Sequence, residues 1–340
     1  MLSQDDFRTS RPTGIFLLKK GYWKALYGET TSQAIDQRVS LLANPDDLDE
    51  GPSAPEGLAD AQIIFAGWST PVMDETFLAS APNLQTVFYA GGSVRPFATE
   101  AFWERGIRVT TAYAVNAIPV SEYVLGAILL SLKHSFQIST GMRAVRGVSD
   151  LPVIPGAYGS TVGLVSLGAV GRRLCKLLRS FDVTVIAYDP FISIREAEDL
   201  CVELTSLDEL FARADVISLH TPLTAATEGL ISGRHFDAMK SGVTFINTAR
   251  GAVVRENEMI AVLQRRPDLQ VILDVTCQEP PETSSPLYNL PNVFLTPHIA
   301  GSVGTERLRL GKCMLEELDR YLSGRPLLWE ITRERATIMA

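Results

Sequence analysis

The chain contains few of the residues that metal centres and nucleic-acid-binding surfaces need. Its 340 residues include only four histidines, and its net charge of -8 leaves no excess of basic residues. The four cysteines form no C-x-x-C pair and have no histidine at metal-ligand spacing: Cys175, Cys201, Cys277 and Cys313. We therefore expect no metal site and no nucleic-acid partner, and we expect these cysteines to be buried as small apolar residues.

Long apolar runs are also absent. The longest, residues 123–132, is shorter than the roughly 20 residues that a helix needs to cross a bilayer. The first twenty residues mix acidic residues and arginines before a short apolar run, unlike a secretory signal. We therefore expect a cytoplasmic protein without a membrane partner. The length predicts two domains of about 150 residues each.

Short apolar runs alternate with helical patterns from residue 162 onward. Each run is almost continuously apolar, as is typical of strands buried on both faces. Between the first two, apolar residues recur at helical spacing over 169–181. This alternation predicts an α/β fold with a doubly wound parallel sheet. The expected strands cover residues 162–167, 183–189, 215–220, 243–248, 271–275 and 292–297.

A second, smaller α/β domain is predicted at the N-terminus. Long helices are expected over 121–145 and 304–322, and the C-terminal tail is expected to return to this domain. The predicted division is 1–117 with 305–340 for one domain and 118–304 for the other. The strands expected in the smaller domain cover residues 14–19, 39–44, 61–67, 84–90 and 107–112.

The stretch Ser-Leu-Gly-Ala-Val-Gly at 166–171 resembles the dinucleotide-binding fingerprint G-x-G-x-x-G, with serine at the first glycine. Ordinary turn glycines would also explain it, but its place between a strand and a helix favours a pyrophosphate site. We expect Ser166 to keep a negative φ, which serine adopts without strain. The expected cofactor contacts in this turn are Ser166, Gly168, Ala169, Val170 and Gly171.

Asp189 ends the strand that follows this helix, 18 residues after the last fingerprint glycine. An acid at this place binds the ribose hydroxyls of the adenosine and repels a 2′-phosphate. We therefore predict NAD, and a preference for it over NADP. The alternative is a solvated acid at a strand end.

Three ionisable residues, Arg250, Glu279 and His298, follow three consecutive predicted strands. Ligands bind beyond the carboxyl ends of such strands. We expect His298 to act as general base, Glu279 to hold its ring and Arg250 to bind a carboxylate. Singly, they could be a structural histidine, a solvated acid and a turn cap; their coincidence favours a catalytic site. Asp274 is expected to contact the cofactor, or else to cap a backbone amide.

Four segments resemble the D-isomer-specific 2-hydroxyacid dehydrogenases, a family that includes phosphoglycerate and glyoxylate/hydroxypyruvate enzymes. They are VGLVSLGAVGRRL with YDP, LHTPLTAATEGLIS, FINTARGAVV, and LDVTCQEP followed by LTPHIAG. The resemblance implies hydride transfer between NAD and a small D-2-hydroxy or 2-keto acid by Arg250, Glu279 and His298. It also implies a homodimer, with a Rossmann NAD-binding domain inserted into a flavodoxin-like substrate domain. Further implied cofactor contacts are Thr221, Pro222, Thr227, Thr248, Ala249, Arg250, Asp274 and His298.

In such proteins a glycine-containing loop of the substrate domain binds the carboxylate, which implies substrate contacts at Gly91, Gly92 and Ser93. Trp68 stands where phosphoglycerate enzymes tend to carry an arginine. We expect Trp68 to face an uncharged substrate group, with domain core as the alternative, and Arg95 remains available for a second anionic group. A different function on the same scaffold is an NAD(H)-sensing, corepressor-like protein without turnover.

Overall fold

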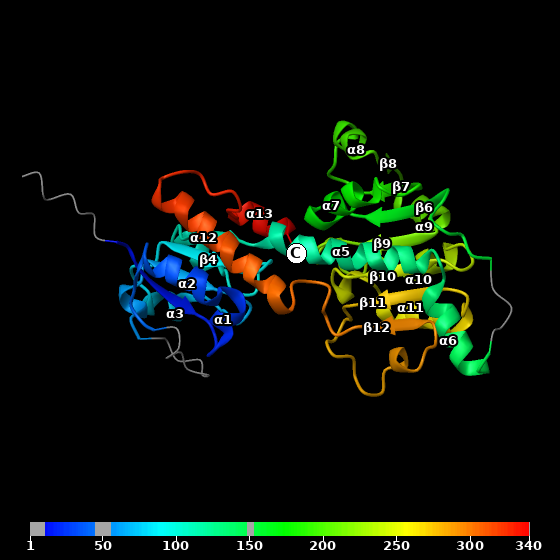
Figure 1. Ribbon diagram of the computed structural model, residues 1–340, viewed down its shortest axis with the longest axis horizontal. Helices are drawn as coiled ribbons and strands as arrows, with labels where there is room; N and C mark the ends of the chain where they lie inside the picture. The colour runs from blue at the N-terminus through cyan, green and yellow to red at the C-terminus, as the bar shows by residue number, and fades with distance from the viewer. Residues whose placement is uncertain (1–10, 45–55, 148–152, 340) are drawn as a thin grey trace, which may run out of the picture. The chain divides into compact units, whose positions relative to one another are not determined.

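The computed structural model describes residues 11–44, 56–147 and 153–339, which form two compact units. The described residues up to Asn116 together with Val303–Ile338 form the first unit, and Ala117–Ser302 form the second. The first unit therefore combines an N-terminal segment, drawn from blue to cyan in Figure 1, with a C-terminal segment drawn in orange and red. These boundaries differ from the predicted ones by one or two residues.

The second unit contains a seven-stranded sheet in the order β12-β11-β10-β9-β6-β7-β8. Every pairing in it is parallel, and the order runs outward from β6 in both directions, as in doubly wound folds (Figure 1). The six predicted strands are confirmed, whereas β8 was missed because two residues are too few to show a pattern. The strands are β6 (Ser160–Val165), β7 (Val183–Tyr188), β8 (Glu203–Leu204), β9 (Val216–Leu219), β10 (Thr244–Asn247), β11 (Gln270–Leu273) and β12 (Val293–Leu295).

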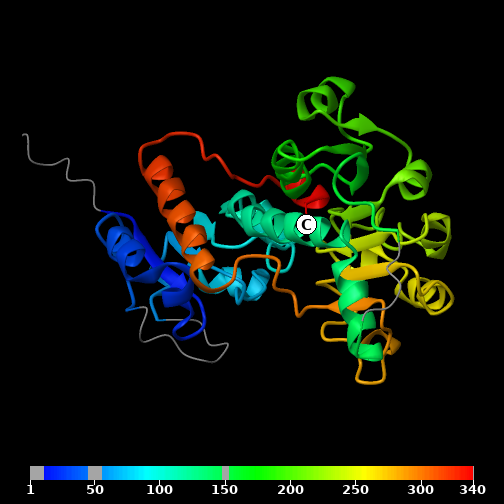
Figure 2. The same cartoon turned by 45° about the vertical axis from the view of Figure 1, so that its right-hand side comes forward.

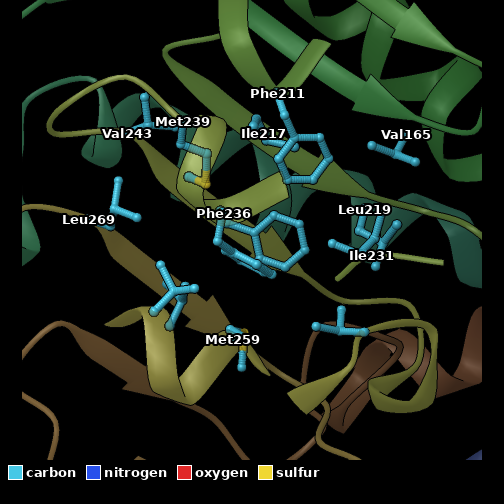
Figure 3. Packing of buried hydrophobic residues seen from close by; sticks show 14 of the residues in the cluster. Val165, Phe211, Ile217, Leu219, Ile231, Phe236, Met239, Val243, Met259 and Leu269 are labelled. Atoms are coloured by element: carbon cyan, nitrogen blue, oxygen red, sulfur yellow. The ribbon is translucent and has the colours of Figure 1, made fainter. Parts of the chain in front are cut away.

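Apolar side chains from strands and helices form a continuous core on this sheet (Figure 3). Phe211, Phe236 and Phe245 pack ring against ring, with 5.0 Å between the ring centroids of Phe236 and Phe245. Each such buried side chain stabilises the fold by about 1.5–3 kcal/mol. The core therefore holds the strands, and with them the loops at their ends. The helices between the strands of this sheet are α7 (Ala169–Leu178), α8 (Ile194–Leu200), α9 (Leu207–Arg213), α10 (Gly233–Ala238) and α11 (Glu256–Arg265).

The first unit contains a five-stranded parallel sheet in the order β2-β1-β3-β4-β5, the flavodoxin-like order. Its strands are β1 (Thr13–Leu17), β2 (Ser40–Leu41), β3 (Ile63–Ala66), β4 (Thr86–Tyr89) and β5 (Arg108–Thr111). Its helices are α1 (Tyr22–Leu26), α2 (Gly28–Asp36), α3 (Glu75–Ser80), α4 (Glu100–Glu104), α12 (Leu308–Leu322) and α13 (Arg333–Ile338).

Helix α12 packs against the N-terminal helices α1 and α2 of this unit (Figure 2). Gly311 permits the close approach, because a Cβ there would lie 2.4 Å from the Leu26 carbonyl oxygen. The buried Glu317 carboxylate accepts a hydrogen bond from Thr110 Oγ1 at 2.7 Å and from the amides of Leu328 and Trp329 at 3.1 Å. These contacts attach the C-terminal segment to β5.

The helix expected over 121–145 is two helices, α5 (Tyr113–Ser131) and α6 (Ser135–Val145). Pro119 lies inside α5 rather than before its start. The helix breaks where Gly156 N donates to the Leu132 carbonyl at 2.9 Å and His134 takes a φ of +49°. Among the described residues α5 is the one helix long and apolar enough to cross a membrane, although Val124 and Ile128 lie in the protein core. The search for uninterrupted apolar runs in the sequence did not detect this helix.

Candidate active site

The turn after β6 differs from the prediction at Ser166, whose φ is +77°. The expected negative φ is wrong, because the chain has to turn sharply from β6 into α7. A Cβ on Gly171 would lie 2.5 Å from the Ser166 carbonyl oxygen, so the helix packs directly on this turn. The Ser166 hydroxyl compensates through a hydrogen bond with Thr221 Oγ1, at 2.8 Å. Serine therefore occupies a left-handed position that favours glycine.

Substituting Ser166 should separate the backbone strain from this hydrogen bond. Ser166→Ala loses the bond and keeps the strain, whereas Ser166→Gly loses both. We expect the glycine variant to be more stable than the alanine variant by about 1 kcal/mol, the usual cost of a left-handed non-glycine residue. Urea unfolding of both variants measures the difference. Equal stabilities would show that the turn stores no such strain.

The region around this turn has features that fit a dinucleotide. A Cβ on Gly168 would meet no atom within 4 Å, which leaves open space beside the start of α7. The amides of Ala169, Val170 and Gly171 lie in the first turn of that helix, where backbone N–H groups favour an anion. The hydroxyl of Thr248 is buried without a hydrogen-bond partner, so a donor or acceptor of the cofactor would satisfy it.

Asp189 is fixed at the end of β7 by two backbone amides. Its carboxylate accepts from Leu167 N at 2.7 Å and from Phe191 N at 2.8 Å. The residues predicted in the loop after β9 are also ordered by local bonds, since Thr227 Oγ1 donates to the Pro222 carbonyl at 2.5 Å. The acid and this loop therefore have defined positions on the carboxyl side of the sheet.

Backbone hydrogen bonds continue the sheet beyond the strands that precede the catalytic candidates. Asp274 N donates to the Asn247 carbonyl at 3.0 Å, and His298 N donates to the Asp274 carbonyl at 2.9 Å. The ends of β10, β11 and β12 therefore lie side by side, as the sequence predicted.

The loop that carries Arg250 is shaped by two residues that the sequence analysis missed. Asn247, buried at the end of β10, accepts from Ala249 N at 3.0 Å and donates to the Arg250 carbonyl at 3.1 Å. A Cβ on Gly251 would lie 2.0 Å from the carbonyl carbon of Thr276, so backbone packs on backbone here. The sequence N-T-A-R-G has Asn three residues before Arg250 and Gly directly after it, and these two turn-forming residues could have indicated this turn.

His298 and Glu279 form a direct pair, with 2.7 Å between Nδ1 and Oε2. Because the carboxylate accepts, Nδ1 carries the proton and Nε2 is left for proton transfer. Both side chains are partly exposed, 49% for His298 and 38% for Glu279. His298 has a φ of +55°, a backbone conformation that histidine adopts rarely. The geometry is that of a general acid or base oriented by a carboxylate.

Asp274 is buried, and its carboxylate accepts three hydrogen bonds. The donors are Thr296 Oγ1 at 2.6 Å and the amides of Ile299 and Ala300 at 2.8 Å each. Of the two roles expected from the sequence, the structure shows the backbone cap. A contact with the cofactor stays a prediction.

In the first unit, Trp68 follows β3 and is 42% exposed, so it is not part of the core. The Arg307 guanidinium lies 5.9 Å from the ring centroids of both Trp68 and Tyr22. Sequence reasoning missed Arg307 because its place depends on the return of the chain at α12. Tyr22 and Trp68 follow β1 and β3, which pair at the point where the strand order reverses.

The predicted carboxylate-binding loop follows β4, next to β3 in the same sheet. Gly91 N donates to the Tyr89 carbonyl at 2.8 Å, and a Cβ on Gly91 would lie 2.6 Å from the Tyr89 ring. Ser93 Oγ accepts from Arg95 N at 3.4 Å. The turn therefore needs glycine at residue 91, and Gly92 and Ser93 lie directly after it.

The expectation that all four cysteines are buried is wrong for two of them. Cys175 and Cys313 are buried, whereas Cys201 and Cys277 are exposed. Cys201 has a φ of +58° and is the C-cap of α8. In the described ranges no group of three or more histidine, cysteine, aspartate or glutamate residues is placed to hold a metal ion.

Comparison with known proteins identifies a family. A sequence model of the D-isomer specific 2-hydroxyacid dehydrogenase NAD-binding domain matches residues 125–300. A D-3-phosphoglycerate dehydrogenase of Archaeoglobus fulgidus is 35% identical over 75% of this chain and 48% of its own length. The putative 2-hydroxyacid dehydrogenase YoaD of Bacillus subtilis is 36% identical over 68% of each chain.

The fold is also that of solved structures. A glyoxylate reductase from Paecilomyes thermophila superposes with a TM-score of 0.76 at 23% identity, covering 96% of this chain and 100% of that one. The chain spans about half the length of the D-3-phosphoglycerate dehydrogenases of Archaeoglobus fulgidus and Methanocaldococcus jannaschii. Given the family match over residues 125–300, the chain belongs to the D-isomer specific 2-hydroxyacid dehydrogenase family.

Proposed function

We propose that this protein interconverts small 2-keto acids and D-2-hydroxy acids with NADH and NAD. The observation that carries the proposal is the His298–Glu279 pair at 2.7 Å. Glu279 follows β11 and His298 follows β12, and β11 pairs with β10, the strand that precedes Arg250. Family membership supports the same reaction class. We assign cofactor binding and the Arg250 contact with the substrate carboxylate to the second unit, and the predicted substrate contacts at Gly91, Gly92 and Ser93 to the first.

Each of the three side chains has a role in the reduction. Bound NADH supplies the hydride to the keto carbon. His298, protonated at Nε2, gives a proton to the carbonyl oxygen, and Glu279 stabilises the imidazolium through Nδ1. Arg250 offers a planar fork of N–H donors that binds the carboxylate and polarises the carbonyl. In the oxidation His298 takes the hydroxyl proton back.

The first unit contains Trp68, a predicted substrate contact, with Arg307 beside it. The sequence analysis expected Trp68 to face an uncharged group, but Arg307 lies over its ring. We propose that these two side chains of the first unit contribute to the choice between keto acids. The Trp68 ring has an apolar face, and the Arg307 guanidinium carries hydrogen-bond donors for an anionic group.

The experiment that tests the proposed function is NADH oxidation with a panel of 2-keto acids. The panel comprises glyoxylate, hydroxypyruvate and 3-phosphohydroxypyruvate, each followed by the loss of NADH absorbance. We expect at least one of them to be reduced. Tight NADH binding without turnover of any acid would favour a nucleotide-sensing protein instead.

NAD preference depends on the charge of Asp189, and Asp189→Asn tests it. Asparagine keeps an acceptor for one of the two amides that the carboxylate binds, but it no longer repels a 2′-phosphate. We expect the ratio of kcat/KM for NADH over NADPH to fall by about tenfold or more. Steady-state kinetics with both cofactors measures it. A wild-type protein that prefers NADPH would exclude this role.

We propose further that the protein works in the cytoplasm as a homodimer. The net charge of -8 and the absence of a basic excess support the expectation that it binds no nucleic acid. The dimer is an expectation from the family resemblance. Sedimentation or light scattering would give the mass in solution.

A further inference from the structure

The loop that carries His298 is bound to one residue of the neighbouring strand. Three consecutive amides, those of His298, Ile299 and Ala300, donate to Asp274, the first to its carbonyl oxygen and the other two to its carboxylate. Because His298 has a left-handed backbone, this loop needs such contacts to keep its conformation. The orientation of the imidazole therefore depends on the Asp274 carboxylate.

The Asp274 carboxylate is in turn held by a chain of two hydroxyl groups. Thr296 Oγ1 donates to Asp274 Oδ1 at 2.6 Å and lies 3.0 Å from the hydroxyl oxygen of Tyr123 on α5. A threonine hydroxyl has a single hydrogen, which is used in the bond to Asp274. Tyr123 must therefore be the donor to Thr296, and the chain runs in one direction, from α5 to the loop of His298.

Burial raises the pKa of Tyr123, since its phenol is partly enclosed and lies near the Asp274 carboxylate. The phenol thus keeps the proton that the direction of the chain requires. The hydroxyl of Tyr123 is separated from the loop of His298 by Thr296 and Asp274, so any effect of Tyr123 on His298 is indirect.

We propose that Tyr123 is a positioning residue for His298, acting through Thr296 and Asp274. The inference rests on the proposed function, in which His298 transfers the proton. When the Tyr123 hydroxyl is removed, Thr296 is free to rotate away from Asp274. The amides of Ile299 and Ala300 then lose their fixed acceptor, and the imidazole leaves the productive orientation.

Three substitutions test the proposal. Misplacement of a catalytic group by about 1 Å can cost on the order of a hundredfold. We expect Tyr123→Phe to lower kcat about tenfold, and Thr296→Val about a hundredfold, while KM for the keto acid and the Kd for NADH stay within about threefold. Thr296→Ser keeps the hydroxyl and should recover wild-type kcat to within about threefold. A wild-type kcat in Tyr123→Phe would overturn the proposal.

The double variant Tyr123→Phe, Thr296→Val separates a shared chain from two independent packing effects. If both residues act through Asp274, the double variant should be no slower than Thr296→Val alone. Losses that multiply would contradict the proposal. A lower Tm with unchanged kcat in Tyr123→Phe would show that the tyrosine only attaches α5 to the sheet.

Amide hydrogen exchange gives a readout that needs no turnover. In Tyr123→Phe we expect the amides of Ile299 and Ala300 to exchange about tenfold faster, while those of β6 stay unchanged. Unchanged exchange at these two amides would overturn the inference, even in an active enzyme. A wild-type protein that reduces no 2-keto acid would instead contradict the proposed function, and the exchange result would still decide whether the loop is held from α5.

Discussion

Replacing His298 with asparagine is expected to lower kcat about a thousandfold, within the range of about 10² to 10⁴ that general acid–base catalysis contributes. Asparagine is the suitable substitute because the residue has a φ of +55°, and asparagine tolerates left-handed backbone better than alanine does. The loop should therefore keep its shape while the proton donor is lost. The measurement is kcat for reduction of the best keto acid of the panel.

The control for this variant is its affinity for NADH, measured by fluorescence titration. Binding should stay within about threefold of wild type, since the proton donor contributes chiefly in the transition state. Full activity in His298→Asn would show that another group transfers the proton. His298 would then have a structural role in an enzyme that uses a different proton donor.

Replacing Arg250 with lysine is expected to lower kcat/KM for the keto acid by about a hundredfold or more, although the positive charge is kept. Lysine cannot present the planar, two-pronged donor set that matches a carboxylate. The Asn247 bonds to Ala249 N and the Arg250 carbonyl involve the backbone, so the loop should persist in the variant. Steady-state kinetics measures the loss.

Arg255→Lys is the matched control, because Arg255 is an exposed arginine a few residues further on that pairs with Glu258 at 3.2 Å. Replacing Arg255 with lysine should change kcat/KM by less than about twofold, because surface ion pairs contribute little. Equal values of kcat/KM for the two lysine variants would show that Arg250 does not bind the substrate.

Much of the fold could be predicted because the strands of a buried parallel sheet appear in the sequence as short apolar runs. The sheet containing β6 and β7 followed from this pattern, and the place of Arg250, Glu279 and His298 followed from the strands before them. The φ of Ser166 could not be predicted in this way. It depends on the contact between its carbonyl and Gly171, which appears only when α7 is packed on β6.

Contacts between distant segments account for the other failures. Arg307 lies over the Trp68 ring only because α12 returns to the first unit. The break after α5 depends on the hydrogen bond that Gly156 N donates to the Leu132 carbonyl. In the sequence Tyr123 is one more residue of an apolar helix. The role of its hydroxyl could not be predicted, because the contact with Thr296 forms only in the folded chain.

The measurement that tests the central claim most directly is the fate of deuterium from NADH labelled at the transferred position of the nicotinamide. After reduction of a 2-keto acid, mass spectrometry and chiral chromatography would locate the label and give the configuration of the product. We predict deuterium at C2 of the D-2-hydroxy acid. An unlabelled product would contradict direct hydride transfer in a site built from His298, Glu279 and Arg250, and a labelled L-isomer would contradict the proposed D-configuration of the product.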